Sequence, residues 1–210
     1  MALEKIIQIL IYLHIGFGTI ALLSGLLALS SKKGHRLHKK SGKIFYYSML
    51  FSAFISLIIA SMPAHQNPFL FAIGIFSAYF ILSGYRSLRF KQKEFDTGLD
   101  KIIAYTIILT GIGMMLFPIL FLGKLNIVLL VFGLISLTFG IRDVNLLRDP
   151  ENLKRNWLTL HLGKMTGGYI AAVSAFFVVN EILPGIWNWF VPGIVGGFYI
   201  TYWTRKLNKK

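Results

Sequence analysis

The stretch Ser31 to Lys43, SKKGHRLHKKSGK, places six cations and two histidines between two long apolar runs, and it contains no acidic residue. Cytoplasmic loops of membrane proteins carry such an excess of Lys and Arg. We therefore take this stretch as the marker that orients the chain in a membrane. Its histidines, His35 and His38, are candidates for chemistry.

The composition indicates an integral membrane protein. The 210 residues are 55% hydrophobic and 14% charged, whereas soluble domains carry about 25% charged residues. The net charge of +14 lies in short loops, where membrane orientation explains it, so the expected partner is the lipid bilayer and not nucleic acid. The chain has no cysteine, which excludes disulfides, iron–sulfur clusters and thiolate metal sites.

Apolar runs of transmembrane length recur along the whole chain. A helix that crosses about 30 Å of hydrocarbon at about 1.5 Å per residue needs roughly 20 apolar residues. Seven runs qualify, at about 7–30, 43–62, 69–88, 102–122, 125–141, 157–179 and 183–203. The predicted fold class is all-α, with residues 1–210 forming one integral membrane bundle of seven transmembrane helices.

The positions of the cations predict the orientation. With Lys164 counted at the cytoplasmic end of the sixth run and Arg205 to Lys210 as a basic tail, 20 of the 22 Lys and Arg fall on one side, and only Lys5 and Lys124 lie opposite. This distribution places the N-terminus outside and the C-terminus in the cytoplasm. The expected location is a bacterial inner (cytoplasmic) membrane, crossed several times.

Histidine supplies the candidate ligands. His14 shares a helical stripe with Gly18, Ala21, Gly25 and Ala28, so it is expected to face the bundle and either to function there or to make an interhelical hydrogen bond. His38 and His161 lie at similar depths near the cytoplasmic face, about 24 Å of helix from His14. His65 is the one histidine on the outer side that could join His14.

Two kinds of metal site fit the histidines near the cytoplasmic face. His38 and His161 would be the axial ligands of a haem b iron, with His14 as a separate outer site. Alternatively, a zinc site would use His35, His38 and His161 as ligands, with Asp143 as a further ligand or base. Imidazole suits both metals, so the ligand type does not choose between them.

Carboxylate chemistry inside the membrane is not expected. No pair of acidic residues lies within any of the seven runs, which argues against a proton pump built on carboxylates. No Walker, GxSxG or HExxH motif occurs either.

Three stretches of the chain begin at a histidine: His14 (HIGFGTIALLSG), His38 (HKKSGKIFY) and His161 (HLGKMTGGYIAA). Together they resemble the domain-of-unknown-function 2306 family of small polytopic bacterial membrane proteins. The resemblance implies a membrane protein without an established activity, and it adds weight to these three histidines as family-type positions. It does not identify a cofactor.

Three functions therefore remain open from the sequence. The first is a membrane protein with a histidine-built metal or haem site near the cytoplasmic face, suited to electron transfer with a redox partner. The second is a zinc-dependent membrane hydrolase acting on a small-molecule or lipid substrate. The third is a non-enzymatic transporter or assembly protein whose histidines are structural.

Overall fold

The computed structural model describes residues 2–208 and is helical throughout, with no strand among those residues. Lys209 and Lys210, the end of the predicted basic tail, lie outside the described residues. The all-α fold class is confirmed. The elements, in order, are α1 (Ala2–Ser30), α2 (Arg36–Ser61), α3 (Pro68–Arg86), the 3₁₀ helix η1 (Ser87–Lys91), α4 (Gly98–Leu122), α5 (Ile127–Leu146), α6 (Pro150–Val179) and α7 (Trp187–Asn208).

Six of the helices in residues 2–208, α1 to α6, are long and apolar enough to cross a membrane. The seventh predicted run forms α7, a helix of 22 residues with Pro192 in its interior. Its glycine, tryptophan and tyrosine residues lower its mean hydropathy, and it is not among the six. Large apolar side chains are exposed all around the bundle, as expected where the solvent is lipid.

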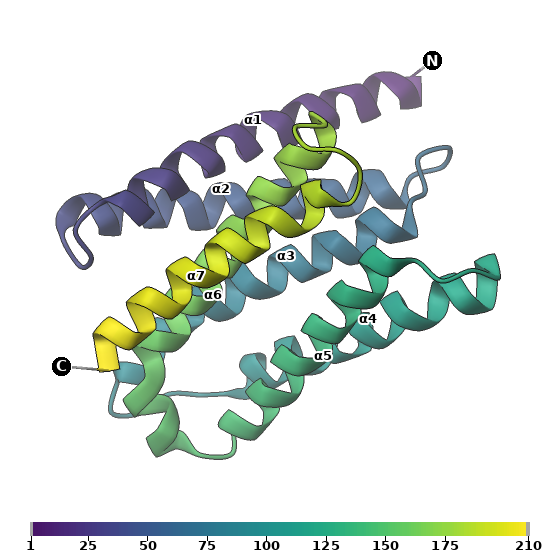
Figure 1. Cartoon of the computed structure of the whole chain (residues 1–210). Helices are drawn as coiled ribbons and strands as arrows, with labels where there is room; N and C mark the ends of the chain where they lie inside the picture. The colour runs from purple at the N-terminus through teal and green to yellow at the C-terminus, as the bar shows by residue number, and fades with distance from the viewer. Residues whose placement is uncertain (1, 209–210) are drawn as a thin grey trace.

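The helices run along a common axis (Figure 1). Helix α1 packs against α2, α2 against α3, α3 against α6, and α6 against α7, while α4 and α5 form a hairpin beside α3. The two ends of the described chain lie at opposite ends of the bundle (Figure 1). We call the end that carries the loops after α1, α3 and α5 the basic end.

Polar residues at the turns fix where three of the helices begin. The side chains of Asn67, Asn126 and Asp149 accept hydrogen bonds from backbone N–H groups three residues later, at α3, α5 and α6. These bonds satisfy donors that have no intrahelical partner. The turn between α4 and α5 contains Gly123 at a φ of +61°, a conformation that glycine adopts without steric cost.

Glycine allows the closest helix contacts. A Cβ built on Gly133 of α5 would lie 2.8 Å from the carbonyl oxygen of Gly111 in α4. A Cβ on Gly84 of α3 would lie 2.9 Å from the backbone nitrogen of Met165 in α6. Small residues at these positions let the backbones touch, which is how helices pack when lipid supplies no hydrophobic drive between them.

The helices extend beyond the predicted apolar runs. Helix α4 begins at Gly98 and not at 102, and α5 continues to Leu146 and not only to 141. As a result Asp100 and Asp143, which the sequence analysis placed outside the runs, are both helical and buried. The predicted runs were too short because they were ended at charged residues, and the partners of these residues lie elsewhere in the chain.

Candidate functional site

His14 lies in α1 and contacts α2. Its Nδ1 is 3.0 Å from the carbonyl oxygen of Ser52, and the Ser52 hydroxyl donates to the His14 carbonyl at 3.2 Å. The predicted stripe does face the bundle, since Ala21 and Ala28 are buried and a Cβ built on Gly18 would lie 3.5 Å from the Ser52 hydroxyl. His14 therefore joins α1 to α2 through an interhelical hydrogen bond.

His38 lies in the first turns of α2, where its Nδ1 is 2.9 Å from the carbonyl oxygen of Ala28. The last carbonyls of a helix have no intrahelical partner, and two other side chains serve the end of α1 as well. Lys33 Nζ donates to Ala28 and Leu29, and the Tyr199 hydroxyl of α7 donates to Leu29 at 3.0 Å. Burial there lowers the pKa of Lys33. His38 thus helps to cap α1.

His161 lies in α6 and reaches across to α3. Its Nδ1 is 2.8 Å from the carbonyl oxygen of Gly84, just before α3 gives way to η1. The change from α-helical to 3₁₀ bonding disturbs the regular pairing of backbone carbonyls at that point. The His161 side chain supplies a donor to one of them.

His38 and His161 share one arrangement. A carbonyl oxygen can only accept, so the Nδ1 of each must carry the hydrogen, and the Nε2 of each neutral ring then presents a lone pair. His14 differs, because its Nδ1 also lies 3.0 Å from the Ser52 hydroxyl, which can donate to it. No hydrogen bond engages the Nε2 of His14, His38 or His161 within residues 2–208. Histidines that bind a metal almost always donate their other ring N–H to such an acceptor, which fixes the ring and raises its basicity.

His38 and His161 are each held by a carbonyl near the end of another helix, α1 and α3 respectively. They come from different helices, α2 and α6, at the basic end. Two stacked aromatic rings lie between α2 and α3 in the same region, where Tyr46 and Tyr85 have ring centroids 4.0 Å apart. His14 belongs to the opposite half of the bundle, as the helix length predicted.

The remaining histidines are placed differently. His35 is exposed and precedes α2 without capping it through its side chain. His65 lies with its Nε2 3.5 Å from Glu4 Oε2, so it pairs with that carboxylate.

The predicted zinc ligands do not come together. No three His, Asp or Glu side chains in the described part of the chain are grouped so that they could hold a metal ion. Within the predicted set, His35 is exposed and the Asp143 carboxylate is engaged by other side chains.

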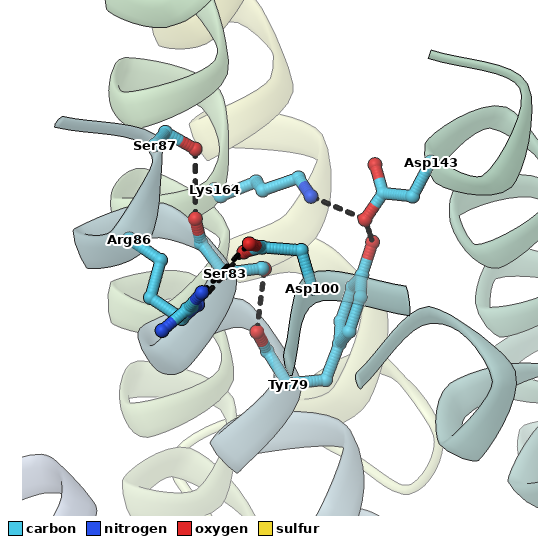
Figure 2. Close-up of polar contacts among 7 residues, drawn as sticks. All are labelled: Tyr79, Ser83, Arg86, Ser87, Asp100, Asp143 and Lys164. Atoms are coloured by element: carbon cyan, nitrogen blue, oxygen red, sulfur yellow. Dashed lines mark hydrogen bonds and ion pairs between the residues drawn. The ribbon is translucent and has the colours of Figure 1, made fainter. Parts of the chain in front are cut away.

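Asp143 belongs instead to a buried polar cluster that joins three helices (Figure 2). Its Oδ2 accepts from Lys164 Nζ of α6 and from the Tyr79 hydroxyl of α3, the latter at 2.7 Å. The side chains of Asp143 and Lys164 are only 10% and 8% exposed. Lys164 Nζ also lies 5.1 Å from the centre of the Tyr79 ring, a cation–π distance.

A second ion pair lies beside the first. Arg86 of α3 donates to both carboxylate oxygens of Asp100 in α4, from Nε at 2.8 Å and from Nη2 at 2.7 Å. This bidentate geometry is the strongest form of an Arg–carboxylate pair. Figure 2 shows both pairs with Ser83 and Ser87 of the intervening α3–η1 segment, whose hydroxyls donate to backbone carbonyls one turn earlier.

A small cavity separates the two ion pairs. Its volume is about 20 Å³, and Ser83, Asp100, Asp143 and Lys164 contribute to its lining together with apolar side chains from α5, α6 and η1. A cavity of at least about 10–15 Å³ with polar walls can hold one water molecule.

The structure adds two features that the sequence pattern did not predict. Lys164, predicted at the cytoplasmic end of the sixth run, is buried in α6 and paired with Asp143. Asp100 and Asp143 lie in two different helices, each long and apolar enough to cross a membrane, and they line one cavity. No sequence pattern identified Tyr79 as a site residue. Arg86 is a cation at the end of an apolar run, and this position could have indicated a nearby acidic partner.

No family model matches the chain, and no curated protein or solved structure matches it. The resemblance to the domain-of-unknown-function 2306 family therefore stays a prediction from three short stretches. Functional inference rests on the geometry of the histidines and of the buried polar cluster.

Proposed function

We propose that this multi-pass helical membrane protein binds a haem b iron through His38 and His161 and transfers electrons to a redox partner. The observation that carries the proposal is the shared state of the two rings. Each has its Nδ1 held by a backbone carbonyl, and each leaves the Nε2 lone pair free. This state is the one that an axial imidazole ligand requires.

The number of available donors favours haem over zinc. A haem iron takes four nitrogens from the porphyrin and needs two axial ligands from the protein, which His38 and His161 can supply. A zinc ion takes three or four protein ligands. The third and fourth candidates, His35 and Asp143, are respectively exposed and bound to Lys164 and Tyr79.

The protein residues would prepare the site before any ligand arrives. The Ala28 and Gly84 carbonyls fix both rings and increase their basicity, and the buried helix contacts around them hold α2 and α6 in place. When bound, haem would supply one-electron chemistry. The surrounding helices would keep the two ligands away from bulk water.

A substitution can separate the ligand role from the structural role of each histidine. Asparagine carries an amide N–H near the position of Nδ1, so His38→Asn and His161→Asn can still donate to the same carbonyls, but they lack Nε2. Each variant is expected to remain folded and to lose the visible absorption of a bound haem. His35→Asn is the matched control, because His35 is exposed and makes no side-chain cap.

The readouts are the visible spectrum and the iron content of the full chain purified in detergent. Absorbance retained by either Asn variant at the wild-type level would exclude that histidine as an axial ligand. A wild-type protein without haem would leave the histidines with the role of satisfying carbonyls at helix ends.

A further inference from the structure

The two buried ion pairs, Arg86–Asp100 and Lys164–Asp143, differ in whether the cation can release its proton. Arg86 keeps its proton at any pH that a protein survives, and it holds Asp100 in a bidentate pair. Lys164 is a primary amine, which can give up its proton when it is removed from water. In the Asp143–Lys164 pair, unlike the Arg86–Asp100 pair, both partners can therefore gain or lose a proton.

We propose that Asp143 and Lys164, with the adjoining cavity, form a proton-binding site inside the membrane-spanning bundle. The cavity of about 20 Å³ has room for one water molecule. Its lining includes Ser83, Asp143, Lys164 and, from the second pair, Asp100, so a water there has the two to four polar partners that buried water needs. That water would connect the pair to the basic end.

The proton transfer needs no further reactant. An N–H bond of Lys164 breaks as an O–H bond forms on Asp143 Oδ2, and a charged pair becomes a neutral amine and a neutral acid. A proton from water at the basic end can then bind the amine, which leaves Asp143 protonated beside an ammonium group. Loss of a proton from either group reverses the second step. The charged and the neutral pair hold the same number of protons and differ only in where one proton lies, whereas the last species holds one proton more.

The surrounding groups set the balance between these states. Tyr79 of α3 donates to the same Oδ2 that Lys164 contacts, and it favours the ionised carboxylate. Asp100 of α4 lines the same cavity as Lys164, and Arg142 is the neighbour of Asp143 in α5. Arg86 offsets Asp100 directly. Opposing charges from four helices therefore surround a single exchangeable proton.

This site does not depend on the proposed haem. His161 and Lys164 lie three residues apart on α6, but the cavity and the ion pairs are formed by side chains other than histidine. The proton site can therefore be tested whether or not the protein carries iron.

Infrared difference spectroscopy of the full chain in lipid nanodiscs, recorded as the pH is changed, detects protonation of a carboxyl group through its C=O stretching band. The wild-type protein is expected to show such a band from a group that is shielded from solvent. Asp143→Asn should remove the band, whereas Asp100→Asn should keep a band but change the pH at which it appears, because Asp100 lines the same cavity. Lys164→Arg keeps a cation next to Asp143 but cannot release its proton, so the band should appear only at lower pH.

Two results would overturn the proposal. One is a pH-dependent carboxyl band that is unchanged in both Asp143→Asn and Lys164→Arg. The other is the absence of any such band from the wild type over the pH range in which it stays folded. Should Asp143→Asn fail to fold, Lys164→Arg still decides, because it retains the ion pair.

Discussion

Asp143 and Lys164 are each expected to cost more stability when changed singly than when changed together. Both side chains are at least nine-tenths buried, and they form an ion pair between α5 and α6. Asp143→Asn leaves the Lys164 ammonium without a counter-ion, and Lys164→Met leaves the Asp143 carboxylate with only the Tyr79 hydroxyl. Removing one partner of a buried pair costs about 3–5 kcal/mol.

The double variant Asp143→Asn, Lys164→Met removes both charges at once. Replacing a buried pair by uncharged groups of similar volume is often close to neutral, so we expect its free energy of unfolding to lie within about 2 kcal/mol of the wild type. The two single losses would sum to about 6–10 kcal/mol. The cycle should therefore give a coupling of at least about 4 kcal/mol, above the upper end of values for residues in contact.

The assay is equilibrium unfolding of the four proteins in mixed detergent micelles, followed by circular dichroism. Tyr79→Phe serves as a reference, because it removes one hydrogen bond to a charged group and should cost about 1.5–3 kcal/mol. Losses that simply add in the double variant would refute the reasoning, since they would mean that the two groups do not interact across the helices.

Two further predictions concern how the helices pack and begin. Gly133→Leu should destabilise the α4–α5 hairpin by about 1–3 kcal/mol, because its Cβ would meet the Gly111 carbonyl oxygen at 2.8 Å. Gly113→Leu is the control, since a Cβ there has no neighbour within 4 Å. Thermal unfolding that fails to distinguish the two variants would argue against the close contact. Asn126→Ala should cost about 1 kcal/mol because it removes the acceptor for the Leu129 N–H at 3.0 Å, and unchanged stability in the same assay would contradict a capping role.

The fold was largely predictable because the length of an apolar run is a direct physical requirement of the bilayer. The boundaries were less so. A charged residue at the end of an apolar run predicts an exposed loop unless a partner for it is known. Asp143 has such a partner, since it accepts a hydrogen bond from Tyr79, which lies 64 residues away in the chain. A linear pattern carries no signal for a contact at that separation, so Asp143 was interpreted as a loop residue.

The partners of the histidines were likewise only partly predictable from the sequence. The stripe of small residues on α1 correctly indicated that His14 faces the bundle. The carbonyls of Ala28 and Gly84 that hold His38 and His161 could not be identified, because every residue has a carbonyl and only the packing of helices selects one. The grouping of four zinc ligands failed for the same reason, since similar depth in the membrane does not place residues on facing helices.

The measurement that tests the central claim most directly is the amount of haem iron bound per chain in the wild-type protein, purified from cells supplied with iron and assayed together with zinc. Two axial histidines predict one haem iron per protein molecule and a visible spectrum that changes on chemical reduction. Protein that contains no iron and shows no visible absorbance would contradict the claim, and stoichiometric zinc in its place would show that the ligands assemble in a way other than the one described.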